Sequence, residues 1–216
     1  MGYEPSKYTL GEEIANAISH GIGAGLGIAG LAVLTVAATT HGEGRVAPCV
    51  IYGTMLVLMF TVSTLYHSFQ GKRLKWVFRV LDHEMIFLMI AGTYTPLLLL
   101  GLGGAWGWSL FGVVWGLAAA GMVFQGFFTG RFKAVSTLIY VLMGWVILIA
   151  LKPLLARMPG PGMQWLWMGG LCYTLGAGVY LFKKIPYHHM VWHLAVLAGA
   201  ICHYFSILWY VLPLPR

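Results

Sequence analysis

Seven long apolar runs separated by short connectors constrain this sequence more than any other feature. Because a helix that crosses a bilayer needs about 20 apolar residues, each run is long enough to be a membrane span. Only 9% of the 216 residues are charged, whereas soluble proteins carry about 25%. The sequence therefore predicts an all-α polytopic membrane protein, a seven-transmembrane-helix bundle in a single domain over residues 1–216, without room for a soluble catalytic domain. The predicted spans are approximately 17–39, 47–69, 80–100, 105–128, 133–151, 163–182 and 190–212.

The net charge of +7 resides in the connectors between these runs. We interpret it as a topology determinant that faces anionic lipid, and not as a nucleic-acid surface. Seven spans place the two termini on opposite sides of the membrane. An amino terminus inside gives nine Lys or Arg residues on that side and four outside, which favours a cytoplasmic amino terminus and an external carboxyl terminus. The inner set is Lys7, Lys72, Arg73, Lys75, Arg79, Arg131, Lys133, Lys183 and Lys184, and the outer set is Arg45, Lys152, Arg157 and Arg216.

Cysteine and glycine usage agrees with a helical bundle. Cys49, Cys172 and Cys202 lie in or beside different runs without a CxxC motif, so the sequence favours neither a disulfide framework nor a cysteine metal site. Glycines four residues apart are typical of closely packed membrane helices, and we interpret them as packing within the bundle. These pairs are Gly21/Gly25, Gly23/Gly27 and Gly112/Gly116.

Polar and ionisable side chains inside the predicted spans are few and concentrated at particular ends. Such side chains are costly in a membrane and mark functional sites. Because successive spans alternate in direction, the starts of the first, third and seventh spans and the end of the second all lie at the inner face. The sequence therefore predicts that these groups meet in one leaflet. They are Glu13, Asn16 and His20, then Ser63 and His67, then Asp82, His83 and Glu84, and finally His188, His189 and His193, with His203 further along the last span.

The spacing of the histidines predicts a metal site. His189 and His193 are four residues apart, so both imidazoles project from one helix face, as in sites that bind one ion through two histidines. An HxxxH pair alone more often reflects core hydrogen bonding, but His67 adds a third imidazole at the same face. Three neutral imidazoles leave the fourth position of a zinc ion open for water, as in catalytic zinc sites. Asp82 is then the carboxylate that can bind or deprotonate that water.

Ser63 precedes His67 by four residues and so shares its helix face. It lacks a GxSxG elbow, so we assign it to the catalytic site with Asp82 as a hydrogen-bonding support. Glu13, Asn16 and His20 follow a three-four pattern that places them on one face as second-shell or structural polar groups.

The remaining histidines fit other roles. His188 lies about 100° around the helix from His189 and is expected at the membrane interface. His203 lies ten residues beyond His193, about 15 Å along a helix, so it is expected to be a buried hydrogen-bonded group and not a ligand. His189 and His203 are spaced for two stacked haems, but no second helix offers a matching pair, so haem is not expected.

Several segments resemble one membrane-protein family over nearly the whole chain. They are EEIANAISHGIG at 12–23, STLYHSF at 63–69, LDHE at 81–84, AGTYTP at 91–96 and PYHHMVWHLAVLAGAICHYF at 186–205. In these motifs the chain resembles the bacterial hemolysin III proteins of the progestin and adipoQ receptor family, which are related to adiponectin receptors and more distantly to alkaline ceramidases. The resemblance implies seven helices with the amino terminus inside. It also implies inner-leaflet zinc on His67, His189 and His193, with Ser63 and Asp82 beside a zinc-bound water.

The predicted function is a zinc-dependent hydrolase of membrane lipid amides or esters in the bacterial plasma (inner) membrane, since the ceramidase relatives imply lipid-amide hydrolysis. The alternative is a non-enzymatic membrane-homeostasis sensor or receptor-like protein with structural zinc. A third interpretation is a hemolysin that causes cytolysis, although continuous, uniformly apolar spans are unlike those of a pore former. Expected partners are membrane lipids, including a lipid substrate or ligand within the bundle, with neither nucleic acid nor haem. The oligomeric state is left open.

Overall fold

The computed structural model describes residues 8–182 and 184–215, and in this part of the chain the regular secondary structure is all helical, without a strand. Lys7, Lys183 and Arg216, which entered the topology prediction, lie outside the described residues. The α-helices are α1 (Leu10–Thr40), α2 (Val46–Ser68), α3 (Lys72–Pro96), α4 (Gly104–Phe128), α5 (Lys133–Gly144), α6 (Leu151–Arg157), α7 (Gly160–Leu181) and α8 (His188–Ser206). Short 3₁₀ segments form η1 (Glu43–Arg45) and η3 (Val146–Ala150), and π-helical turns form η2 (Leu97–Leu102) and η4 (Ile207–Val211).

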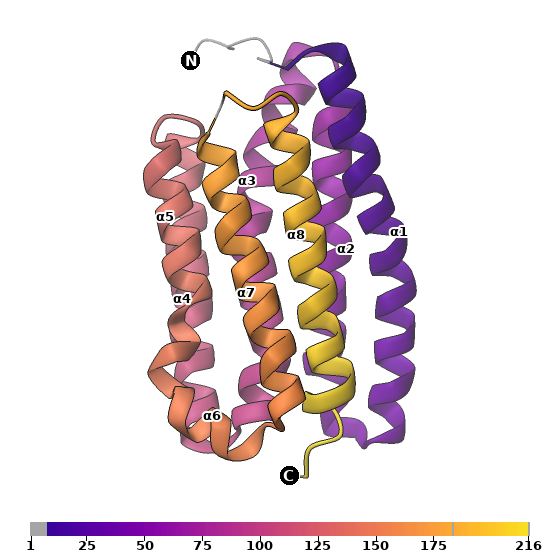
Figure 1. Ribbon diagram of the computed structural model, residues 1–216, viewed down its shortest axis with the longest axis vertical. Coiled ribbons are helices and arrows are strands. Elements are labelled where there is room, and N and C mark those ends of the chain that lie inside the picture. The colour runs from indigo at the N-terminus through magenta and orange to yellow at the C-terminus, as the bar shows by residue number, and fades with distance from the viewer. Residues whose placement is uncertain (1–7, 183, 216) are drawn as a thin grey trace.

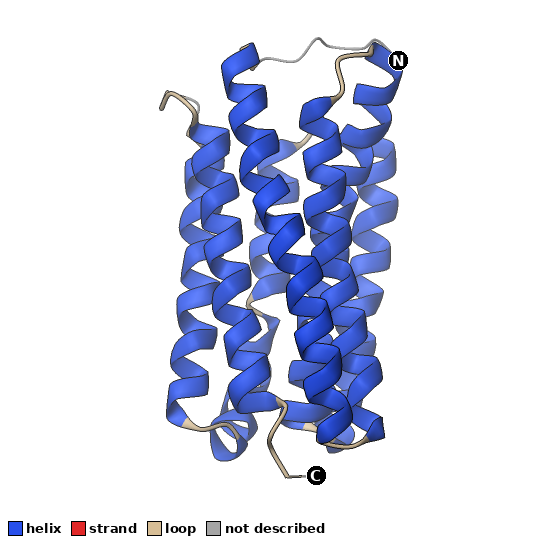
Figure 2. Ribbon diagram, turned by 90° about the vertical axis from the view of Figure 1, so that its right-hand side faces the viewer, coloured by secondary structure: helices blue, strands red, loops and turns tan. Residues whose placement is uncertain are grey.

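The long helices stand side by side in one bundle, with α1 and α8 beginning at the same end and the described chain ending at the other (Figure 1). A view turned by 90° shows the same elongated bundle, with connections gathered at its two ends (Figure 2). Six helical segments are long and apolar enough to cross a membrane: Leu10–Thr40, Glu43–Ser68, Lys72–Leu102, Gly104–Phe128, Lys133–Arg157 and His188–Val211. The seventh long helix, α7, has 22 residues and is less apolar because Gly, Trp and Tyr interrupt it. The all-α prediction is confirmed.

Two helices begin earlier than the apolar runs predict. α1 begins at Leu10 behind a capping box, in which Thr9 Oγ1 accepts the Glu12 amide at 3.3 Å and Glu12 Oε2 accepts the Thr9 amide at 2.8 Å. α3 begins at Lys72, so the basic segment 72–75 is its first turn and not a connector. Apolar runs mark only the hydrocarbon-embedded part of a helix, whereas backbone hydrogen bonding carries it on into polar residues.

The fifth predicted span is not one continuous helix, which corrects the expectation of uninterrupted spans. α5 ends at Gly144, and the chain passes through η3 before α6 begins. Tyr94 of α3 hydrogen-bonds the backbone groups at this break. Its hydroxyl donates to the Gly144 carbonyl at 2.7 Å and accepts a hydrogen bond from the Ile147 amide at 2.9 Å. Pro153, which has no amide hydrogen, fits the first turn of α6.

The predicted glycine pairs differ in whether they pack against another helix. A Cβ at Gly23 would lie 2.7 Å from the Phe60 ring, and one at Gly27 would lie 3.4 Å from Val57, so these two glycines allow α1 to approach α2 closely. Gly112 and Gly116 on α4 have nothing within 4 Å of the same position. The interpretation as packing within the bundle is therefore wrong for the α4 pair.

Candidate metal centre

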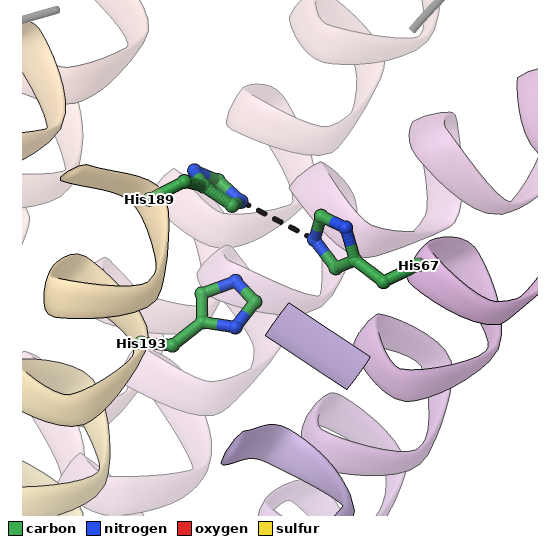
Figure 3. Close-up of side chains that lie close together, drawn as sticks. All are labelled: His67, His189 and His193. Carbon is green, nitrogen blue, oxygen red and sulfur yellow. Dashed lines mark hydrogen bonds between the residues drawn. The ribbon is translucent and has the colours of Figure 1, made fainter. Parts of the chain in front are cut away.

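Three buried imidazoles meet where α2 ends and α8 begins. His67 comes from the last turn of α2, and His189 and His193 from the first two turns of α8 (Figure 3). One ligand nitrogen from each residue lies within 4.8 Å of the other two. The side chains are almost inaccessible, with His67 and His193 each 1% exposed. This is the group of ligands predicted from the spacing, brought together from positions more than one hundred residues apart in the chain.

One pair of nitrogens has the separation expected at a tetrahedral metal ion. His67 Nε2 lies 3.2 Å from His189 Nε2, and two nitrogens bound to zinc at 2.0–2.1 Å in a tetrahedron are about 3.3 Å apart. His67 Nδ1 lies 2.6 Å from Glu13 Oε2. Because an ionised carboxylate only accepts hydrogen bonds, Nδ1 carries the proton and Nε2 keeps its lone pair. The lone pair of His67 therefore faces His189.

His193 has the same arrangement with a different partner. Its Nδ1 lies 3.1 Å from the Asn16 carbonyl oxygen and 3.1 Å from Ser19 Oγ. Since Ser19 Oγ itself donates to the Asn16 carbonyl at 2.8 Å and that carbonyl only accepts, Nδ1 of His193 is the donor. Its Nε2 is thereby left with a lone pair for a metal. Such outer partners fix the tautomer and orientation of metal-binding histidines.

The polar face of α1 supplies most of these partners. Glu13, Asn16 and His20 all lie on it as predicted, and each is at most 3% exposed. The His20 ring stacks on the His193 ring with centroids 3.5 Å apart and planes 7° apart, and His20 Nδ1 lies 2.7 Å from Ser63 Oγ. Ser63 thus contacts the centre through His20, and its catalytic role remains a prediction.

Sequence reasoning missed Ser19 and Lys75. Ser19 lies three residues after Asn16 on the same helix face, and this spacing is the sequence signal that indicates it. Lys75 was counted as a connector charge, but it is 4% exposed and its Nζ lies 2.8 Å from Glu13 Oε1. It also lies over the Tyr66 ring, 4.8 Å from the centroid. The Glu13 carboxylate therefore joins α3 to His67 through one buried ion pair.

Aromatic residues cover the open side of His189. Tyr8, just before α1, stacks on the His189 ring at 4.9 Å with planes 27° apart. Burial raises the pKa of Tyr8 well above its ordinary value, so the phenol stays neutral. His188 is partly buried, with its ring 6.0 Å from the Tyr8 ring. Among the described residues, the histidines that cluster as possible metal ligands are His67, His189 and His193, without His188.

Asp82 and His189 line one cavity. The space in the cavity, counted out to open solvent at its mouth, is about 1160 Å³. Its walls come from α2, α3, α4, α5, α7 and α8, with Gly130 between α4 and α5 and Trp145 just after α5. Asp82 is 7% exposed, and its Oδ2 lies 4.0 Å from His83 Nδ1. His203 lines the same cavity, with its Nε2 3.2 Å from the Leu166 carbonyl oxygen. The centre therefore opens onto a largely apolar chamber that also contains the carboxylate predicted to serve it.

Comparison with known proteins agrees with the sequence motifs. A family model described as "Haemolysin-III related" matches residues 8–204, a range that contains His67, His189 and His193. The chain is 46% identical over 203 residues to Hemolysin-3 of Bacillus cereus, covering 94% of this chain and 93% of the relative. It is 43% identical over 209 residues to a Hemolysin-3 homolog of Bacillus subtilis (strain 168), covering 96% and 98%. It is also 32% identical over 213 residues to the human Monocyte to macrophage differentiation factor, covering 95% and 85%.

Proposed function

The chain belongs to the haemolysin-III related family and is a multi-pass membrane protein, and from these premises we propose that it is a zinc-dependent hydrolase of membrane lipid amides or esters. The observation that carries the proposal is the group of three buried imidazoles whose nitrogens lie within 4.8 Å of one another, beside a largely apolar cavity that His189 lines. In two of them, His67 and His193, the Nδ1 atom donates to a group on α1, so Nε2 keeps a lone pair that can bind a metal. The donor set and its burial favour a transition metal.

Zinc suits these ligands because imidazole binds it well and three protein ligands leave one coordination position for substrate. A zinc ion held there supplies Lewis acidity that polarises the carbonyl of an amide or ester. His67, His189 and His193 hold the ion, and Glu13 and Asn16 keep the protons of His67 and His193 on Nδ1.

Asp82 is the residue proposed to handle the proton. Its carboxylate lines the cavity that His189 also lines, so a lipid carbonyl at the histidines would lie on the side from which Asp82 can act. Asp82 accepts a proton from the attacking water as general base. The apolar wall of the cavity holds the acyl chain of the substrate and limits the access of bulk water.

We place the histidine end of the bundle in the cytoplasmic leaflet of a bacterial inner membrane. Of the described basic residues, Lys72, Arg73, Lys75, Arg79, Arg131, Lys133 and Lys184 lie near this end, and Arg45, Lys152 and Arg157 lie in the turns and short helix of the other. That excess follows the positive-inside rule. Labelling of cysteines introduced at Lys72 and Lys184 with an impermeant thiol reagent should occur only from the cytoplasmic side, and labelling of both from outside would reverse the orientation.

The test of the enzyme proposal combines metal analysis with lipid product analysis. Protein purified without chelator should contain about one zinc per chain and should release products from a panel of ceramides, phospholipids and acyl amides. His193→Ala should lose both properties, because removal of one ligand from three leaves a poor site. Zinc-loaded wild-type protein that releases nothing from the whole panel would overturn the hydrolase proposal.

A second candidate function is a membrane sensor in which the metal is structural. The observation that favours it is that Glu13, Asn16 and Ser19 tie α1 to the histidines of α2 and α8. A metal at this point would brace three helices. Bound zinc together with the complete absence of turnover would support this function.

A further inference from the structure

A second polar group lines the cavity far from the three histidines. It consists of His203 on α8 and Tyr173 on α7, both of which line the cavity that His189 also lines. His203 lies ten residues beyond His193 and fourteen beyond His189 on the same helix, which corresponds to about 15 and 21 Å along its axis. One cavity therefore connects two separate polar ends.

Two glycines seat these rings. A Cβ at Gly169 of α7 would overlap the His203 ring, and a Cβ at Gly199 of α8 would lie 2.9 Å from the Tyr173 ring. Each helix thus has a glycine, and so no side chain, at the point where the ring from the other helix packs. The two rings contact each other at 5.3 Å in an edge-to-face arrangement with planes 64° apart. The reciprocal seats hold both side chains in fixed positions.

The tautomer of His203 follows from its hydrogen bond to the backbone of α7. His203 Nε2 lies 3.2 Å from the Leu166 carbonyl oxygen, and because a carbonyl only accepts, Nε2 carries the proton and Nδ1 is an acceptor. Within the described chain, His203 Nδ1 and the Tyr173 hydroxyl are buried without a hydrogen-bond partner. Leaving a buried polar atom without a partner is destabilising, so two of them beside one cavity point to a ligand group that satisfies both.

A hydroxyl group has the matching chemistry. It can donate to His203 Nδ1 and accept from the Tyr173 hydroxyl, whereas a carboxylate has no hydrogen to give to Nδ1. Between the two polar ends the cavity wall includes the apolar side chains of Met59, Ile86, Met89, Ile90 and Val196. A ligand that fills this space is long and apolar along its length.

We propose that His203 and Tyr173 bind a hydroxyl group at the far end of a long acyl chain whose other end lies at the three histidines. This assignment names the substrate class of the proposed hydrolase and rests on that function only for the chemistry at the histidine end. The recognition of the hydroxyl itself is a binding property and needs no turnover.

The test compares two free acids that differ only at the far end of the chain. Palmitate and ω-hydroxypalmitate share one carboxylate, so the ratio of their affinities reports on the His203 and Tyr173 end. Equilibrium competition against a fluorescent acyl probe on purified full-length protein should show about tenfold tighter binding of ω-hydroxypalmitate, equivalent to one or two net hydrogen bonds.

Tyr173→Phe removes only the hydroxyl and should reduce the preference severalfold, and His203→Phe should do the same. Tyr204→Phe is the matched control, because the Tyr204 hydroxyl already donates to the Gly30 carbonyl at 3.0 Å and lies outside the cavity lining. It should leave the preference unchanged. Equal affinities in wild-type protein, no saturable binding of either acid, or a preference that survives Tyr173→Phe would each overturn the proposal. Failure of hydrolysis with the preference intact would reject the proposed function alone.

Discussion

The two ends of α8 use the same residue type in different ways. At its start, His189 and His193 face His67, and the Nδ1 atoms of His67 and His193 donate hydrogen bonds to polar groups of α1. Further along, His203 donates Nε2 to a backbone carbonyl of α7 and leaves Nδ1 without a partner among the described residues. The first arrangement brings three imidazole nitrogens within 4.8 Å of one another, and the second leaves a single acceptor beside a cavity.

This difference teaches that the neighbouring helix decides what a buried histidine does. α1 places Glu13 against His67 at the end of α2, and Asn16 and Ser19 against His193 at the start of α8. These contacts fix the tautomers of His67 and His193 that a metal needs. α7 offers His203 the Leu166 carbonyl, the space above Gly169 and the edge of the Tyr173 ring. Chemistry is therefore expected at the start of α8, and recognition of a neutral group near its end.

The largest expected effect is on hydrolysis, at the start of α8 where chemistry is expected. Asp82→Asn should lower any lipid hydrolysis by about 10²- to 10⁴-fold while leaving zinc bound, because an amide cannot accept the proton but the three imidazoles remain. Product release and metal content are measured on the same preparation. Tyr204→Phe is the control and should keep wild-type turnover, since its hydroxyl lies outside the cavity lining and donates to the Gly30 carbonyl. Full hydrolysis by Asp82→Asn would show that Asp82 is not the base.

Metal content separates the two ends of α8 directly. His193→Ala should weaken zinc binding by more than about 100-fold, because loss of an outer partner of a ligand alone costs about 10–100-fold. His203→Ala should retain about one zinc per chain. Metal analysis after gel filtration measures both. Equal zinc loss in the two variants would remove the distinction between the ends.

Removal of an outer partner should have a smaller effect. Glu13→Gln should weaken zinc affinity by about 10–100-fold, because the amide no longer holds the proton on His67 Nδ1 as a carboxylate does and leaves Lys75 without its buried partner. Glu12→Gln, which alters a half-buried acidic side chain of the same helix turn that hydrogen-bonds Thr9, should keep the wild-type affinity. Competition with a chelator of known affinity measures both variants. An unchanged affinity in Glu13→Gln would place Glu13 outside the metal centre.

The smallest effect tests the seat of His203. Gly169→Ala should destabilise the protein by about 1–3 kcal/mol through overpacking, because the new methyl group meets the His203 ring. Gly112→Ala has open space at the same position and should be neutral or slightly stabilising. Unfolding midpoints in one detergent compare the two. A neutral Gly169→Ala would show that the seat is loose, which weakens the case for a fixed ligand site.

The sequence alone determined where the helices lie and which residues share a face. Apolar runs located the seven long helices, and the four-residue spacing placed His189 and His193 together because an α-helix repeats every 3.6 residues. Alternating helix direction brought His67 to the same end, and this prediction is confirmed. Hydropathy did not predict the polar first turns of α1 and α3. The apolar composition ends at the membrane boundary, whereas the helical hydrogen bonds of the backbone continue beyond it.

Only the tertiary structure decided how each helix is rotated and therefore which atoms meet. The sides of a membrane helix that face lipid and protein are equally apolar, so hydropathy does not set that rotation. Packing determined that Glu13 holds both His67 and Lys75 and that Tyr94 closes the break after α5. It also determined that a single cavity reaches from Asp82 to His203. Spacing within one helix follows from the backbone, whereas distances between helices depend on side chains that interlock only once the bundle has formed.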